Sequence, residues 1–214
     1  SAITQLTVKN CIIGDATNVP DYALKIDGAT GATVKDVTIE NNEIHGTGNA
    51  KGIIWFDYVA TASTGNLITK NQITGDGTGS SNAIGILLEN CTGNTSITKN
   101  TLYTLKTSGS GVLAAIREAS SSAGTLNIFN NMLGGNFTKS SSANYFVIDL
   151  RGTAARNVYH NTLVLNSVCT AGFDNANLYI ENGTANFKNN IVVNRFDNAS
   201  SFCIFNNLTT PANL

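Results

Sequence analysis

Apolar positions recur along the chain in a six-residue phrase that reads apolar, any, any, Asn, any, apolar. The first full copy is Ile39-Glu40-Asn41-Asn42-Glu43-Ile44, and later copies repeat its spacing. With Cys11 in a degenerate first copy, the Asn position is held in turn by Cys11, Asn42, Asn71, Asn100, Asn131, Asn161 and Asn190. Successive members are 31, 29, 29, 31, 30 and 29 residues apart. A fixed period of this length indicates a solenoid, in which each repeat stacks on the next.

Between these phrases, apolar residues alternate with other residues over short runs rich in Ile, Val, Phe and Thr. Examples are Leu24 and Ile26, Ile54 and Phe56, and the run Phe146, Ile148, Leu150. Alternation predicts strands, whereas a helical repeat needs apolar residues three and four positions apart. We therefore expect an all-β, single-stranded, right-handed parallel β-helix of about seven coils of about thirty residues.

In each coil, the phrase is expected to supply one strand and its corner, and the alternating run a second strand about halfway round. The expected inward column is Ile26, Phe56, Leu88, Ile116, Leu150 and Ile180. Asn suits the corner because it tolerates left-handed backbone conformations, and because stacked amides can satisfy each other. The Asn column is therefore predicted to be a structural ladder.

Composition limits the remaining possibilities. The 214 residues carry one unbroken repeat series, so we expect a single domain over residues 1–214. A net charge of -1 argues against a nucleic-acid partner, and no apolar run is long enough to span a membrane. Because open solenoid ends need covering, and no capping helix is evident, we expect a segment of a longer protein or ends capped by another chain. The four cysteines fit no metal spacing and are expected to be small buried thiols.

Two outward columns on the second strand carry the candidate chemistry. One column is expected to read Asp27, Asp57, Glu89, Arg117, Arg151, Glu181, and the column two residues earlier Lys25, Trp55, Leu87, Ala115, Asp149, Tyr179. Stacked carboxylates repel, so Asp27, Asp57 and Glu89 could hold a Ca²⁺ ion, with Arg117 or Arg151 beside it as a catalytic candidate. The alternative is a set of ordinary surface ion pairs, Glu89 with Arg117 and Arg151 with Glu181.

The same face offers a candidate ligand-binding surface. Trp55, the only tryptophan, is expected to point outward beside Asp57, together with Ile53, Leu87, Glu89 and Tyr179. Aromatic rings beside carboxylates suit a sugar ring. The alternatives are that the loop at 75–82 or at 108–111 covers the patch, or that the patch contacts another protein.

Three stretches carry a family resemblance: residues 126–133, 157–163 and 187–194, for example Phe187-Lys188-Asn189-Asn190-Ile191-Val192-Val193-Asn194. They resemble the right-handed parallel β-helix repeats of large secreted or cell-surface bacterial proteins, within the superfamily that includes the pectate lyases. The resemblance implies an extracellular location. In those lyases, acidic residues on one sheet hold Ca²⁺ and an Arg or Lys abstracts a proton, and Asp27, Asp57 and Glu89 with Arg117 or Arg151 are similar in kind.

Two functions follow as expectations. The first is a non-enzymatic extracellular structural or adhesion module whose partner is a polysaccharide or a cell-surface glycan. The alternative is a Ca²⁺-dependent polysaccharide lyase acting on uronate-containing glycans.

Overall fold

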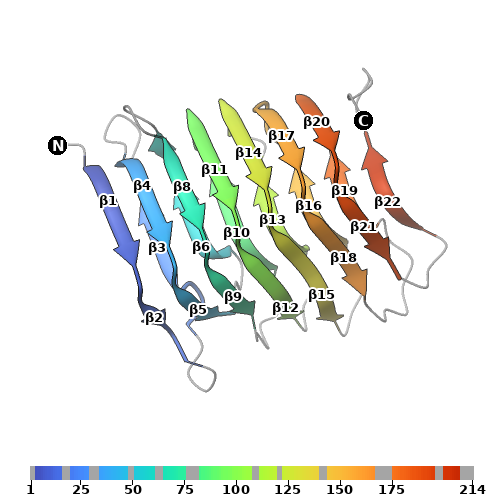
Figure 1. The fold of residues 1–214 in the computed structure, drawn as a ribbon, viewed down its shortest axis with the longest axis horizontal. Coiled ribbons are helices and arrows are strands. Elements are labelled where there is room, and N and C mark those ends of the chain that lie inside the picture. Colours follow the sequence, from blue (N-terminus) through green and yellow to red (C-terminus); the bar gives the residue numbers. More distant parts are fainter. Residues whose placement is uncertain are drawn as a thin grey trace.

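The computed structural model describes residues 3–15, 20–28, 34–47, 51–60, 65–75, 82–107, 111–119, 122–139, 144–166, 175–195 and 200–207. Within these ranges the regular secondary structure is all strand, and the strands form three parallel sheets stacked along one axis (Figure 1). The prediction of an all-β parallel solenoid is confirmed. No described segment is a helix of the length and apolar character that crossing a bilayer requires.

Each coil contributes a strand to each sheet. Sheet A contains β1 (Thr4–Lys9), β4 (Val34–Glu40), β8 (Asn66–Thr69), β11 (Asn94–Thr98), β14 (Thr125–Phe129), β17 (Ala155–Tyr159) and β20 (Thr184–Lys188), with the short β7 (Val59–Ala60) paired to β4. Sheet B contains β2 (Ile12–Ile13), β5 (Glu43–Gly46), β9 (Gln72–Gly75), β12 (Thr101–Thr107), β15 (Met132–Lys139), β18 (Thr162–Asn166) and β21 (Ile191–Asn194). Sheet C contains β3 (Leu24–Asp27), β6 (Gly52–Asp57), β10 (Ala83–Glu89), β13 (Leu113–Glu118), β16 (Tyr145–Leu150), β19 (Asn175–Ile180) and β22 (Ser201–Asn206).

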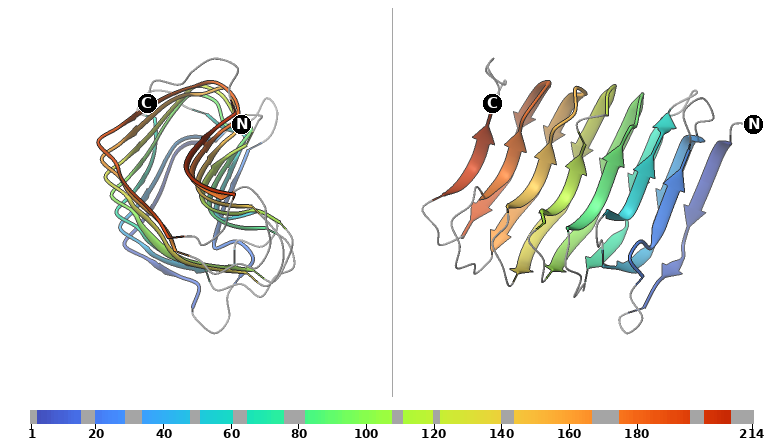
Figure 2. Two further views of the ribbon diagram at one scale, coloured as in Figure 1. Left: turned by 90° about the vertical axis from the view of Figure 1, so that its right-hand side faces the viewer. Right: turned by 180° about the vertical axis from the view of Figure 1, so that it is seen from behind.

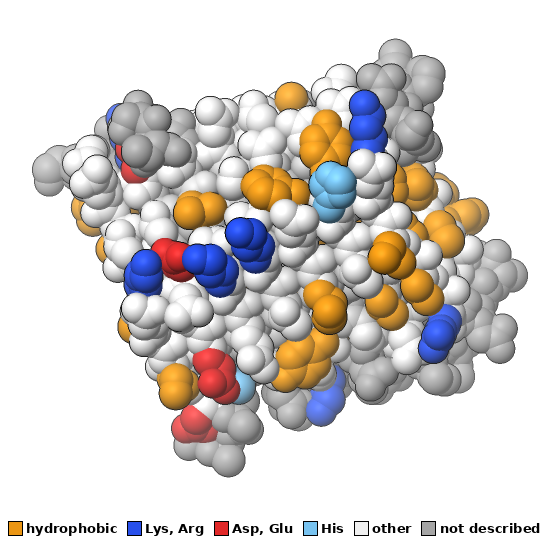
Figure 3. Space-filling view, viewed as in Figure 1, with side chains coloured by type: hydrophobic (Ala, Val, Ile, Leu, Met, Phe, Trp, Pro, Cys, Tyr) orange, Lys and Arg blue, Asp and Glu red, His pale blue; other side chains and the backbone are white. Residues whose placement is uncertain are grey.

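The expectation of two strands per coil is wrong, because the repeated phrase holds two strands and not one. In the first full copy, β4 ends at Glu40 and β5 begins at Glu43, so the corner between sheets A and B falls inside the phrase. Seen along the axis, sheets A and B form two sides of the cross-section, and the third side, sheet C, bends inward (Figure 2). The outer faces of sheets A and B carry mostly uncharged side chains, with a short row of charged ones (Figure 3).

The predicted asparagine ladder occupies the A–B corner. Asn100, for example, is 1% exposed, and its Oδ1 accepts hydrogen bonds from both the backbone N and the Nδ2 of Asn71, each at 3.0 Å. Its own Nδ2 donates to the backbone oxygen of Ile68 at 2.9 Å and to Oδ1 of Asn131 at 3.1 Å. The same bonds repeat from Asn42 to Asn190, and Cys11 closes the series by donating its backbone N–H to Asn42. Each buried amide is satisfied by the neighbouring coils.

The prediction that the ladder asparagines adopt the left-handed conformation at the corner is wrong. The left-handed conformation lies on the residue before each ladder position: Asn10, Asn41, Lys70, Lys99, Asn130, His160 and Asn189 have φ between 55° and 58°. The ladder residues themselves are not among the positive-φ residues. Their role is hydrogen bonding, whereas the turn is made by an exposed neighbour that tolerates Lys or His as well as Asn.

The interior column expected at Ile26 is also corrected at one coil. Phe56, Leu88, Leu150 and Ile180 occupy that column as predicted, but Glu118 stands between Leu88 and Leu150. Ile116 lies in the adjacent inward column, between Ile86 and Ile148. The strand is therefore shifted by two residues from the expectation, which assumed that no charged residue would face inward.

Glu118 is accommodated because Arg156 from β17 reaches it inside the solenoid. The side chains of Glu118 and Arg156 are 1% and 0% exposed, and Oε2 of Glu118 accepts from Nε of Arg156 at 2.7 Å and from Nη2 at 2.6 Å. The remaining guanidinium donors reach the backbone oxygens of Gly152 and Asn182. A buried ion pair needs such additional hydrogen bonds to offset the cost of removing two charges from water.

The cysteines only partly follow the expectation of buried thiols. Cys91 is 4% exposed, and burial raises the pKa of its thiol to about 12. Cys11 and Cys203 are free and exposed, so the expectation is wrong for them. Cys11 lies beside β2 and Cys203 lies in β22, and each of these strands pairs with one other strand among the described residues. Cys169 lies outside the described residues.

Candidate functional site

The candidate site is the outer face of sheet C, which is concave because its strands bend. Ile53 and Ile54 are consecutive, yet both are fully buried in the main core. At the equivalent position in the next coil, a Cβ added to Gly85 would lie 2.0 Å from Cδ1 of Leu102 on sheet B, so this residue also faces inward. Two inward residues in succession break the alternation of a flat strand. The prediction that Ile53 accompanies Trp55 on the outside is therefore wrong.

The bend turns three columns of side chains toward the concavity. The first, before the bend, holds Ile84, Ala114, Phe146, Ala176 and Phe202. The second holds Lys25, Trp55, Leu87, Arg117, Asp149, Tyr179 and Phe205. The third begins with Asp27, Asp57 and Glu89 and continues in later coils with Arg151 and Glu181. We call these three columns together the sheet C face.

The structure corrects one predicted member of these columns. Arg117 was expected beside Glu89 in the third column, but it lies in the second, between Leu87 and Asp149, where Ala115 was expected. Ala115 is fully buried in the main core. The shift follows from Glu118, which takes the inward position and so turns Arg117 outward.

The predicted aromatic platform at Trp55 is covered on its faces. The indole is 8% exposed, with Nζ of Lys25 and of Lys51 at 4.3 and 4.9 Å from the ring centroid. The ring of Tyr22 lies 5.5 Å away at an angle of 48°. Cations over an indole face are attracted by its quadrupole, so a sugar ring would have to displace a lysine to stack there. Of the loops considered as covers, residues 76–81 and 108–110 lie outside the described residues.

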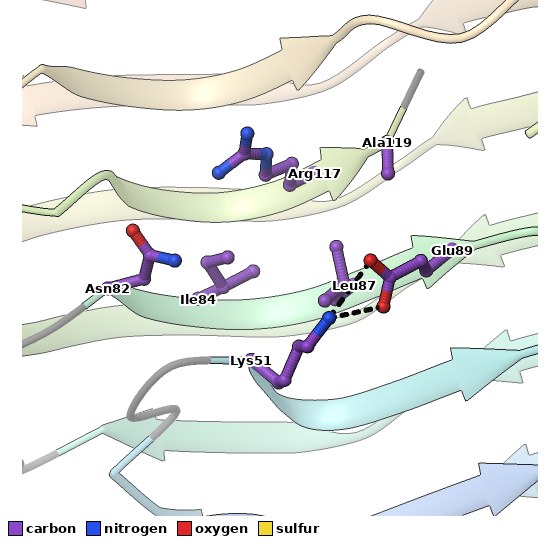
Figure 4. A pocket seen from close by; sticks show the side chains of 7 residues that line it. All are labelled: Lys51, Asn82, Ile84, Leu87, Glu89, Arg117 and Ala119. Atoms are coloured by element: carbon purple, nitrogen blue, oxygen red, sulfur yellow. Dashed lines mark hydrogen bonds and ion pairs between the residues drawn. The ribbon is translucent and has the colours of Figure 1, made fainter. Parts of the chain in front are cut away.

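A pocket of about 160 Å³ lies next to Trp55, in the middle of the sheet C face. Its lining consists of Lys51, Asn82, Ile84, Leu87, Glu89, Arg117 and Ala119. Figure 4 shows Lys51 and Arg117 on either side of β10, with Ile84 and Leu87 between them. Nζ of Lys51 donates to both carboxylate oxygens of Glu89, at 2.7 and 2.9 Å. The predicted ion pair of Glu89 with Arg117 is thus replaced by one with Lys51.

Beyond the pocket, a chain of charges runs along the face. The carboxylate of Asp149 is fully buried and lies between Arg117 Nε at 3.3 Å and Arg151 Nε at 2.9 Å. Arg151 Nη1 in turn lies 3.3 Å from Oε2 of Glu181, which confirms that predicted pair. Burial raises the pKa of Asp149 although both arginines oppose the shift, and burial lowers the pKa of Arg117. Arg151 therefore has two carboxylate partners, whereas Arg117 has one.

The last coils of the face carry stacked aromatic rings. Phe146 and Tyr179 lie 4.7 Å apart between centroids, Tyr179 and Phe205 5.5 Å, and the Arg151 guanidinium lies 5.0 Å from the Tyr179 ring. Phe202 is the most exposed of these rings at 36%. Phe146 alternates with Ile148 and Leu150 in the sequence, yet it faces outward because the strand bends between Phe146 and Ile148. Trp55 and Tyr179 lie four coils apart, about 19 Å at the usual strand spacing, so the predicted ligand residues form a strip and not one cluster.

The three carboxylates proposed for calcium do stand in register on adjacent coils. Each has a local partner: Asp27 pairs with Lys25 at 2.5 Å, Asp57 accepts from Asn90 Nδ2 at 2.8 Å, and Glu89 binds Lys51. Across the described ranges, no group of three or more His, Cys, Asp or Glu side chains is arranged to hold a metal ion. Calcium binding at this column stays a prediction.

Comparison with known proteins identifies no relative of this chain. No protein-family model matches the chain, and no curated protein or solved structure matches it significantly. The case for a function therefore depends on the geometry of the sheet C face.

Proposed function

We propose that this chain is a β-helical binding module whose sheet C face holds a carbohydrate, without catalysing a reaction on it. The observation that carries the proposal is the pocket in the concave face, which combines an apolar floor with a few converging polar groups. Ligand sites in proteins share this combination of concavity, apolar lining and sparse polar groups. Sugars present both apolar C–H faces and many hydroxyl groups, so Ile84 and Leu87 can pack against the former while Asn82 and Lys51 bind the latter.

The repeat supports an extended ligand. Side chains in each column recur at one strand spacing, roughly 4.8 Å, so a chain-like ligand lying along the axis meets an equivalent position at every coil. Arg151, Tyr179 and Phe202 extend the face beyond the pocket, and the fully buried ring of Phe146 stacks on Tyr179. These residue types dominate the energetics of many recognition surfaces.

The location proposed for this module is the cell exterior, as part of a secreted or cell-surface bacterial protein. The support is the resemblance of the repeats at 126–133, 157–163 and 187–194 to those of such proteins. The finer assignment to the pectate-lyase-like superfamily is part of the same proposal. Labelling intact producing cells with an antibody against the chain tests the location, and signal only after lysis would count against it.

A steric block of the pocket tests the binding proposal. Ala119→Trp fills the rim of the pocket without removing a charge, and Ala155→Trp is the matched control, because Ala155 is exposed on sheet A. Binding to neutral, uronate-containing and sulfated oligosaccharides is measured by titration calorimetry. We expect at least one class to bind the wild type and the control, and to bind Ala119→Trp about tenfold more weakly or worse. Equal binding by both variants, or no binding by the wild type across the panel, would refute the proposal.

The second candidate is the Ca²⁺-dependent lyase, favoured by the confirmed register of Asp27, Asp57 and Glu89. Arg117 is the better placed base of the two arginines, because Arg151 already lies between two carboxylates. Incubation with a uronate polysaccharide and Ca²⁺ would then release an unsaturated product that absorbs in the near ultraviolet. Its formation by the wild type and not by Arg117→Gln would replace the non-catalytic proposal with this one.

A further inference from the structure

The pocket in the sheet C face is lined by more positive than negative charge. Lys51 and Arg117 contribute two cations and Glu89 one carboxylate, and the remaining lining residues, Asn82, Ile84, Leu87 and Ala119, are uncharged. Glu89 directs both of its oxygens to Lys51, whose side chain keeps 37% of its surface exposed. A lysine with three donors on one carboxylate retains a donor for a second acceptor.

Arg117 is the group in the pocket with unused capacity. Its side chain is 20% exposed, and its one ion-pair contact with the described residues runs from Nε to Asp149 at 3.3 Å. Nε has no hydrogen-bond partner among the described residues, and neither Nη group donates to any of them. A guanidinium offers five donors in a planar fork that matches a carboxylate or a sulfate. Nε is buried without a hydrogen bond, and the Nη groups are open to an acceptor that the described part of the chain does not supply.

We infer that the pocket is an oxyanion site that receives an anionic substituent of the bound glycan, a carboxylate or a sulfate ester, between Lys51 Nζ and the Nη groups of Arg117. The inference rests on the proposed carbohydrate function and assigns the class of sugar. Figure 4 places the two cations on opposite sides of the pocket, with Leu87 on the strand between them, so the anionic group would lie between the cations while the sugar ring contacts Leu87 and Ile84. Charge-assisted hydrogen bonds of this kind are about twice as strong as neutral ones.

Asp149 does not oppose this arrangement. Its carboxylate is fully buried and does not line the pocket, and its oxygens already face Arg151 at 2.9 and 3.1 Å. Removing Arg117 would also leave Asp149 with one arginine. The loss of binding in an Arg117 variant is therefore compared with the loss in a Lys51 variant, which leaves both arginines beside Asp149.

The only tryptophan provides a direct readout, since its ring centroid lies 4.9 Å from Lys51 Nζ. Fluorescence and calorimetric titrations with galacturonate and with a sugar sulfate test the site without requiring a polysaccharide. We expect saturable binding below about 10 mM, weakened about ten- to hundredfold in Lys51→Gln and Arg117→Gln. Arg117→Lys should bind the carboxylate more weakly than the wild type, because the planar fork is lost. Lys188→Gln, an exposed lysine on sheet A, is the matched control and should bind like the wild type.

The outcomes separate this inference from the proposed function. Binding of neutral oligosaccharides with no response to either anion refutes the oxyanion site and leaves the carbohydrate function standing. Saturable binding of galacturonate or the sugar sulfate without binding of any oligosaccharide supports the site and refutes an extended glycan as its ligand. Equal anion affinity in the wild type, Lys51→Gln and Arg117→Gln, or no saturable signal by either method, overturns the oxyanion site. A preference for the carboxylate or the sulfate identifies which substituent the pocket takes.

Discussion

Replacing Arg156 by methionine tests the most unusual feature of the interior, the ion pair with Glu118. The change leaves a carboxylate that is 1% exposed facing an apolar core between Leu88 and Leu150. It also removes the donors to the backbone oxygens of Gly152 and Asn182. Breaking a buried pair by removing one partner typically costs about 3–5 kcal/mol. That loss is a large part of a domain stability of about 5–15 kcal/mol.

The pH dependence of the loss has a definite sign. Burial raises the pKa of Glu118 in the folded chain, and the charge of Arg156 opposes that rise. Without Arg156 the folded pKa moves higher still. A carboxyl whose pKa is raised by folding favours the folded state at pH values below its unfolded pKa, and this contribution is lost as pH rises through the folded pKa. The deficit of Arg156→Met relative to the wild type should therefore be smaller near about pH 5 than near about pH 8.

Denaturant unfolding followed by circular dichroism at both pH values measures the effect. The double variant Glu118→Leu with Arg156→Met is the control, because leucine would join the column of Leu88 and Leu150. Replacing a buried pair by apolar residues of similar volume is often neutral or stabilising by about 1–4 kcal/mol, so the double variant should recover most of the loss. The reasoning is refuted if the single variant loses less than about 1 kcal/mol near neutral pH, or if the double variant is as unstable as the single one.

Three further outcomes follow from the fold. Asn100→Ala removes four hydrogen bonds from the centre of the ladder and should lower the free energy of unfolding by about 2–4 kcal/mol in a denaturant titration; a loss below about 0.5 kcal/mol would contradict its role. Gly85→Ala should cost about 1–3 kcal/mol by the same assay, because the added Cβ would meet Leu102 at 2.0 Å, and an unchanged midpoint would show that Gly85 does not face sheet B. In the native chain, alkylation followed by mass spectrometry should modify the exposed Cys11 and spare Cys91, whose pKa of about 12 keeps the thiol protonated; equal labelling of both would argue against the burial of Cys91.

The parts of the fold that depend on local repetition were predictable from the sequence. The period, the parallel strands, the corner ladder and the adjacent carboxylates Asp27, Asp57 and Glu89 all follow from residues that recur at the same phase. Because every coil repeats the same phrase, the position assigned to a residue in one coil can be checked against the equivalent residues of the adjacent coils.

Two features escaped prediction because they depend on contacts between distant residues. The bend at Ile53 and Ile54 breaks the alternation that defines inward and outward positions, so the prediction that Ile53 faces outward beside Trp55 was wrong. The shift at Glu118 depends on Arg156, 38 residues later, and a charged residue is assigned outward unless its partner is known. That single shift moved Arg117 into the pocket, which is why the candidate site was predicted less completely than the fold.

The asparagine ladder gives the molecule a direction and a unit of length. Each ladder Oδ1 accepts from the coil before it, and each ladder Nδ2 up to that of Asn161 donates to the coil after it, so coils can follow one another only head to tail. Deleting residues 72–100 would join Asn71 to Thr101 and restore the phrase across the junction. Gain or loss of whole coils by gene duplication or deletion would then lengthen or shorten the sheet C face in steps of roughly 4.8 Å. The reach of the binding surface could change in this way without redesign of the fold.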